Sequence, residues 1–98
     1  MDTFESLLFG IAMGKNNRSE DVGNDTINGY TIDTCYTIDQ GWETAVWYKN
    51  SEIVIVGRYP DKETAAQGHR EWVETCTTNK PMMVYSVQTD RFESLRED

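Results

Sequence analysis

The sequence predicts an α+β fold: a small antiparallel sheet of three to four strands in the order β-β-β-α-β, with one helix packed on it and a tethered amphipathic helix at the N-terminus. From residue 30 an apolar residue stands at every second position of the first stretch, two further strand-like stretches follow it up to residue 60, and one stretch with helical spacing comes after them. Strands that succeed one another directly pair as hairpins, which is typical of α+β proteins. Because 98 residues have room for one core, we expect a helix over residues 1–14, a polar tether over 15–28 and one domain over 29–98.

The N-terminal segment has the pattern of a short amphipathic helix. Asp2 and Glu5 stand at the spacing of a capping box, while Gly10 weakens the helix by about 1 kcal/mol relative to alanine. Packing must therefore hold this helix in place. Its apolar stripe consists of Phe4, Leu7, Leu8 and Ile11. The stripe is buried either on the sheet of its own chain or in another protein, and the sequence leaves both alternatives open.

Residues 15–28 are almost all polar and are punctuated by glycine and asparagine, which predicts a tether rather than a helix or strand. Within this segment, "NDTING" has the spacing that opens a calcium-binding loop. The position at which such a loop needs a bidentate glutamate is Cys35, so we exclude a calcium site.

The tetrapeptide YTID occurs twice, at residues 30–33 and 36–39. Its spacing produces the alternation of a half-buried strand, which we expect over residues 30–38. On a continuous strand Asp33 and Asp39 are about 20 Å apart, too far to share a metal ion or a proton. The doubling therefore predicts a strand rather than a two-carboxylate site.

Two further strands follow, over residues 42–49 and 52–60, joined by a polar connection of hairpin length. Gly57 suggests a bulge in the second of them. Glu43 and Arg58 fall on these adjacent strands and are expected to form a cross-strand ion pair.

One long helix is expected after Pro60. Asp61 is a good N-cap for a helix over residues 62–78, and Gly68 allows that helix to approach the sheet closely. Its buried face consists of Ala65, His69, Trp72, Val73 and Cys76. A fourth strand is expected over 82–88, followed by a polar tail or a single helical turn.

The candidates for chemistry are few. His69 is the only histidine, and Cys35 or Cys76 as a nucleophile beside it would make a Cys/His hydrolase. Cys35, His69 and Cys76 together would supply three zinc ligands, with Asp33 or Asp39 as the fourth. The spacing of these residues selects for neither, and a lone histidine on a core face is usually a packing residue. We therefore expect no enzymatic activity, no cofactor and no metal.

The balance of 17 acidic and 9 basic residues gives a net charge of −8, which disfavours direct binding to nucleic acid. No apolar run is long enough to span a membrane. A protein partner is favoured instead, because the sheet face that the helix leaves uncovered is expected to display aromatic side chains. The predicted partner-binding residues are Phe4, Leu7, Leu8, Ile11, Trp42 and Trp47.

The pattern over residues 30–74 resembles a group of small tailed-bacteriophage proteins. The matching residues are Asp33, Thr34, Cys35, Tyr36, Glu43, Thr44, Val46, Tyr59, Gly68, His69 and Trp72. The resemblance implies a phage origin and carries over no catalytic residue. Together with the tethered apolar helix and the lack of a convergent polar site in the sequence, this origin favours a non-enzymatic protein that docks onto other virion subunits or onto itself in the phage head or tail. The alternative is an acidic host-directed inhibitor that mimics nucleic acid or counters host defence. Either protein would be found in the virion or the host cytoplasm.

Overall fold

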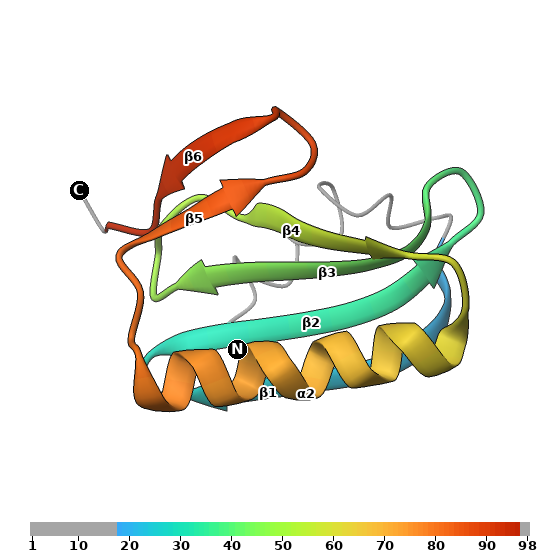
Figure 1. The fold of residues 1–98 in the computed structure, drawn as a ribbon, viewed down its shortest axis with the longest axis horizontal. Coiled ribbons are helices and arrows are strands. Elements are labelled where there is room, and N and C mark those ends of the chain that lie inside the picture. Colours follow the sequence, from blue (N-terminus) through green and yellow to red (C-terminus); the bar gives the residue numbers. More distant parts are fainter. Residues whose placement is uncertain (1–17, 97–98) are drawn as a thin grey trace.

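The computed structural model describes residues 18–96 and confirms an α+β protein: a four-stranded antiparallel sheet, one helix packed on it and a β-hairpin (Figure 1). The helix predicted over residues 1–14 lies outside the described residues. In chain order, the elements are β1 (Arg18–Ile27), β2 (Tyr30–Thr37), β3 (Gly41–Tyr48), β4 (Val54–Tyr59), α2 (Lys62–Thr78), β5 (Met83–Ser86) and β6 (Arg91–Ser94).

The main sheet has the strand order β1-β2-β3-β4, and each neighbouring pair is antiparallel. The first predicted strand ends one residue early, at Thr37, and leaves Ile38 exposed in the turn. In β4 the partner of Thr44 is Gly57 and the partner of Ala45 is Ile55, so one extra residue is inserted between them. The bulge expected at Gly57 is therefore confirmed.

The expectation of an irregular tether over residues 15–28 is wrong for most of its length, because Arg18–Ile27 form strand β1 at the edge of the sheet. Asn28 and Gly29 both have positive φ values, 53° and 88°, and they join β1 to β2 directly. Such Asn-Gly turns match the twist of a hairpin and fix its register. The polar strand is therefore stabilised by pairing with β2, since most of its side chains stay exposed.

The C-terminal part also differs from the prediction. The strand expected over 82–88 is present as β5, but it pairs with β6 rather than with the main sheet. Strand β6 lies in the segment where a polar tail or a helical turn was expected. The hairpin is fastened to the sheet edge by a hydrogen bond from the backbone N–H of Val87 to the carbonyl of Ile55, at 2.9 Å. The order is therefore β-β-β-β-α-β-β.

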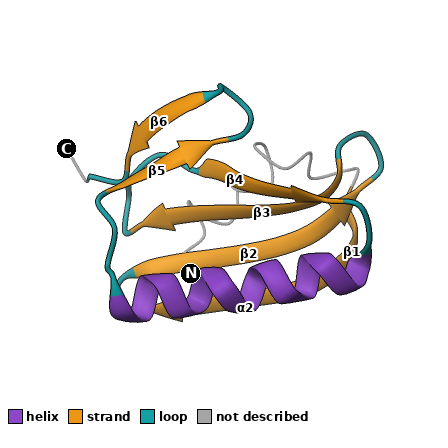
Figure 2. Ribbon diagram, in the orientation of Figure 1, coloured by secondary structure: helices purple, strands orange, loops and turns teal. Residues whose placement is uncertain are grey.

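Helix α2 covers one face of the sheet (Figure 2). Asp61 is its N-cap, as expected, because its Oδ1 accepts a hydrogen bond from the backbone N–H of Thr64 at 2.8 Å. The core between helix and sheet, closed at one end by the hairpin, consists of Tyr30, Ile32, Val46, Val54, Val56, Cys76, Val84 and Leu95. A second cluster, on the opposite face of the sheet, consists of Cys35, Ala45, Trp47 and Ile55.

Candidate functional site

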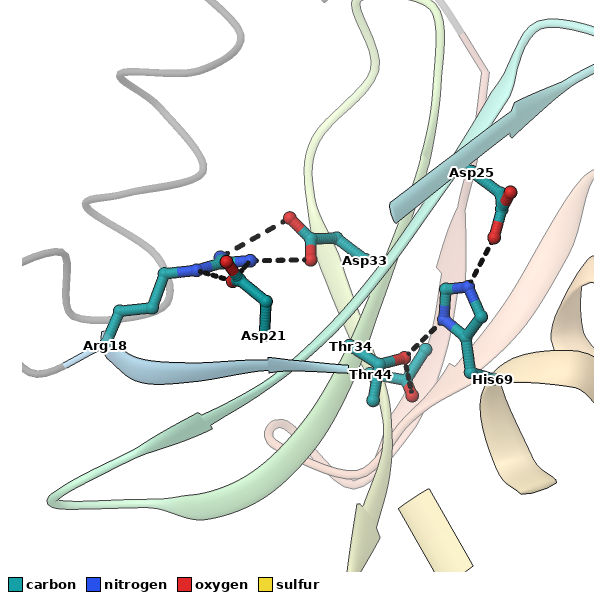
Figure 3. A network of polar contacts seen from close by, with 7 residues as sticks. All are labelled: Arg18, Asp21, Asp25, Asp33, Thr34, Thr44 and His69. Atoms are coloured by element: carbon teal, nitrogen blue, oxygen red, sulfur yellow. Dashed lines mark hydrogen bonds and ion pairs between the residues drawn. The ribbon is translucent and has the colours of Figure 1, made fainter. Parts of the chain in front are cut away.

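The most extensive buried polar network lies between α2 and the sheet, around His69 (Figure 3). Its Nδ1 is 2.7 Å from Thr34 Oγ1, and its Nε2 is 2.7 Å from Asp25 Oδ2. Thr34 Oγ1 is also 2.6 Å from Thr44 Oγ1, which accepts a hydrogen bond from the Tyr59 hydroxyl at 3.0 Å. The network therefore connects the helix with all four strands of the main sheet.

The order carboxylate, imidazole, hydroxyl resembles a hydrolytic triad, but the geometry supports an anchor. Thr34 and Thr44 are fully buried beneath α2, so neither hydroxyl is open to a substrate. A Cβ atom at Gly23 would lie only 2.6 Å from His69 Nε2, so this glycine makes room for the ring against β1. His69 thus acts as the hydrogen-bonded packing residue that the sequence favours.

The two cysteines do not complete a site with His69, because both ring nitrogens of the histidine already have other partners. Cys35 lies in the cluster on the far face of the sheet, and Cys76 lies on the buried face of α2. Burial raises the pKa of Cys35 to about 12 and that of Cys76 to about 11. Both therefore remain thiols at neutral pH, which is unfavourable for nucleophilic chemistry.

The two aspartates of the YTID repeat do not cooperate. Asp33 is buried on the far face of the sheet, where it is paired with Arg18, whereas Asp39 is exposed in the turn after β2. Within residues 18–96 no group of three or more His, Cys, Asp or Glu side chains is placed to hold a metal ion. The same residues contain no helix with the length and apolarity that crossing a bilayer requires.

Two ion pairs place charge on the far face of the sheet. Arg18 Nη2 lies 2.9 Å from Asp33 Oδ1, and Arg58 Nε lies 2.8 Å from Glu43 Oε2, which confirms the predicted cross-strand pair. Burial raises the pKa of both carboxyls above their ordinary values, and the arginines oppose this effect. These buried carboxylates depend on their arginines, because an unpaired charge at such a site is costly.

The outer face of the β5–β6 hairpin exposes large apolar side chains. Alternation along β5 buries Val84 and leaves Met83 and Tyr85 outward, while Phe92 of β6 is paired with Tyr85 and is 66% exposed. The rings of Tyr85 and Phe92 meet edge to face, with centroids 5.5 Å apart. We call Met83, Tyr85 and Phe92, together with the exposed Met82 directly before β5, the hairpin face.

A pocket of about 230 Å³ opens beside the hairpin face, at the end of the core. Met82 belongs to both, so the pocket and the hairpin face are continuous. Apart from Asn28 and Lys80 the lining is apolar or aromatic. The lining residues are Asn28, Tyr30, Tyr48, Lys80, Pro81, Met82 and Leu95.

Of the predicted partner-binding residues, the structure describes Trp42 and Trp47, and these two lie on opposite faces of the sheet. Trp47 is 1% exposed, and Trp42 is half-buried against Tyr36, with ring centroids 4.8 Å apart. The other four predicted residues lie outside the described part of the chain. The sequence interpretation also missed the hairpin face, although the alternation of Met83 and Tyr85 around buried Val84 is visible in the sequence.

No family model, curated protein or solved structure matches this chain.

Proposed function

We propose that this protein is non-enzymatic and works by docking onto another protein through the hairpin face, as a small head or tail component of a bacteriophage particle. The observation that carries the docking proposal is the set of three large apolar side chains exposed on one short hairpin, with Met82 exposed directly before it. Small soluble proteins rarely gather such residues at the surface without a partner. The phage assignment rests on the resemblance of residues 30–74.

The chemistry of the hairpin face suits a protein partner. Methionine and aromatic residues are enriched in protein interfaces, where they bury much area at a low cost in conformational entropy. The adjoining pocket, of about 230 Å³, has room for one apolar side chain of the partner.

The surface charge does not favour the alternative, an inhibitor that mimics nucleic acid. Such a mimic needs its carboxylates gathered on one face. Here the exposed acidic residues are spread over the strands, the turns and the helix. They include Glu20, Asp21 and Asp25 on β1, Asp39 and Glu52 in turns, Glu63, Glu71 and Glu74 on α2, and Asp90 in the β5–β6 turn.

Quantitative mass spectrometry of purified phage particles tests the proposal. We expect the wild-type protein in the particles and a strongly reduced amount of Phe92→Ser. Ile38→Ser is the matched control, because Ile38 is equally exposed, at 69%, but lies in the β2–β3 turn. Absence of the wild-type protein from particles, or equal retention of Phe92→Ser and Ile38→Ser, would contradict the proposal.

A further inference from the structure

The wall of the pocket beside the hairpin face is fixed by contacts within the fold. The Tyr30 hydroxyl donates a hydrogen bond to the carbonyl of Pro81 at 2.6 Å. The backbone N–H of Leu95 donates one to the carbonyl of Met82 at 2.8 Å. The rings of Tyr30 and Tyr48 are tilted against each other, with centroids 4.9 Å apart. All five residues line the pocket, so its shape is set before a ligand enters, which lowers the cost of binding.

The size and the lining of the pocket favour an aromatic side chain. A cavity of about 150 Å³ with apolar walls is sufficient to hold a benzene molecule. This pocket, at about 230 Å³, therefore has room for a phenyl ring and the carbon that attaches it to a backbone. Tyr30 and Tyr48 belong to the lining, and aromatic rings pack favourably on one another in tilted or edge-to-face arrangements.

The charge around the pocket is positive, although the chain as a whole has a net charge of −8. The exposed Lys80 lines the pocket, and Nζ of the exposed Lys49 lies 5.2 Å from the centroid of the Tyr48 ring. Over the described part of the chain, neither lysine forms an ion pair and no acidic side chain lines the pocket. Arg70 and Arg96 are also without a carboxylate there, but neither lines the pocket. The cations that are paired with a carboxylate are Arg18, Arg58, Lys62 and Arg91.

The C-terminal end of α2 lies beside the pocket and carries an opposing charge of about half an elementary unit. Its last carbonyls are bonded within the protein. Nδ2 of Asn28 donates to the carbonyls of Cys76 and Thr77, at 3.4 Å each, and the backbone N–H of Lys80 donates to the carbonyl of Thr75 at 3.2 Å. The full charge of the Lys80 ammonium therefore outweighs the helix end at the pocket.

We propose that the pocket binds an acidic segment of the docking partner, with one aromatic side chain inserted into the pocket and a neighbouring carboxylate at Lys80. The inference rests on the proposed docking through the hairpin face, because Met82 belongs to both surfaces. The net charge of the chain alone would favour a basic partner. At this site, however, a basic segment would meet Lys80 and Lys49, so the local charge selects against it.

Peptide titration of the full-length protein, followed by two-dimensional ¹H–¹⁵N NMR, tests the inference. The probe is a blocked tripeptide with phenylalanine between two glutamates. We expect saturable shifts at the backbone amides of Tyr48, Lys80 and Leu95, which line the pocket. A tripeptide with alanine in the centre should bind about tenfold more weakly or worse, because it leaves the pocket empty. A tripeptide with lysines on both sides of phenylalanine should bind about fivefold more weakly.

Lys80→Gln should weaken binding of the glutamate peptide by about threefold and leave binding of the lysine peptide no weaker, because it removes only the charge at the rim. Lys62→Gln is the matched control, since Lys62 is also exposed but lies at the opposite end of α2. It should leave the affinity for the glutamate peptide unchanged.

No shift at the pocket amides at millimolar glutamate peptide, or equal affinity for the glutamate and lysine peptides, would overturn the inference. So would an equal loss in Lys80→Gln and Lys62→Gln. Tighter binding of a peptide that ends in phenylalanine with a free carboxylate would overturn it in favour of a chain terminus. None of these results would change the amount of Phe92→Ser in phage particles, so failure of this inference is distinguishable from failure of docking through the hairpin face.

Discussion

Replacing His69 by alanine tests whether its polar network holds α2 on the sheet. The substitution removes the contacts with Thr34 and Asp25, both 2.7 Å long, and a side chain that is almost completely buried. The buried contact with Thr34 contributes about 1 kcal/mol. The contact with Asp25 is discounted to about 0.5 kcal/mol, because that carboxylate is more than half exposed.

Loss of the packed imidazole ring lowers the free energy of unfolding by about 1–2 kcal/mol more. Thr34 keeps Thr44 as a hydrogen-bond partner, at 2.6 Å, so no further penalty arises for an unsatisfied hydroxyl. The expected decrease in the free energy of unfolding is therefore about 3 kcal/mol, a large fraction of the 5–15 kcal/mol typical of a folded protein.

Urea unfolding followed by tryptophan fluorescence and far-UV circular dichroism measures this change. Gln67→Ala is the matched control, because Gln67 is exposed on the same helix and bonds only to the exposed Glu71. Gln67→Ala should lower the free energy of unfolding by less than about 0.5 kcal/mol. A double-mutant cycle with Thr34→Val should show a coupling of about 1 kcal/mol. A loss for His69→Ala as small as that for Gln67→Ala, or no coupling with Thr34, would refute the anchoring role.

Three further changes are predicted. Arg58→Met should lower the free energy of unfolding by about 2 kcal/mol, because it leaves the buried Glu43 carboxylate unpaired. Adding Glu43→Gln to this variant should restore most of the lost stability. Urea unfolding that shows no loss for Arg58→Met would contradict the prediction. Burial raises the pKa of Asp33 and Glu43, so the folded state binds protons at these carboxyls more readily than the unfolded chain does. The two groups therefore contribute to stability at low pH, and this contribution is lost as the pH rises through their raised pKa values. Calorimetry should therefore show a Tm that falls as the pH rises above the ordinary carboxyl range, with a shallower fall in Glu43→Gln; an identical fall in both proteins would exclude this cause. Gly29→Ala should lower the free energy of unfolding by about 1–2 kcal/mol, because φ of Gly29 is +88° and the new Cβ would lie 2.8 Å from a ring carbon of Tyr48. An unchanged urea midpoint would contradict this prediction and would show that the turn relaxes freely.

The parts of the fold that the sequence predicted correctly are those in which local pattern and burial agree. Strand β2 alternates in polarity, β3 and β4 are rich in β-branched and aromatic residues, and α2 has both an N-cap at Asp61 and a periodic apolar face. The sequence also predicted the ion pair of Glu43 with Arg58, because cross-strand neighbours follow from hairpin register. In each case the signal lies within a few residues of the feature.

Strand β1 was missed because its side chains carry almost no apolar pattern. An edge strand is stabilised by backbone pairing, and its signal was the Asn28-Gly29 turn, which favours a hairpin more strongly than the polar residues favour a tether. Strand β6 was missed because it has only four residues, whereas β5 was expected but its pairing with β6 was not. The His69 network joins residues as far as 44 positions apart, a contact that no local pattern specifies.

Photo-crosslinking from the hairpin face in intact phage particles tests the docking claim most directly. Phe92 and, in a parallel preparation, Ile38 are each replaced by benzoylphenylalanine, since both positions are exposed and lie on different parts of the surface. If the protein docks through the hairpin face, we expect a crosslink from position 92 to one other virion protein or to a second copy of this chain, and none from position 38. Crosslinks from position 38 with none from position 92 would contradict it.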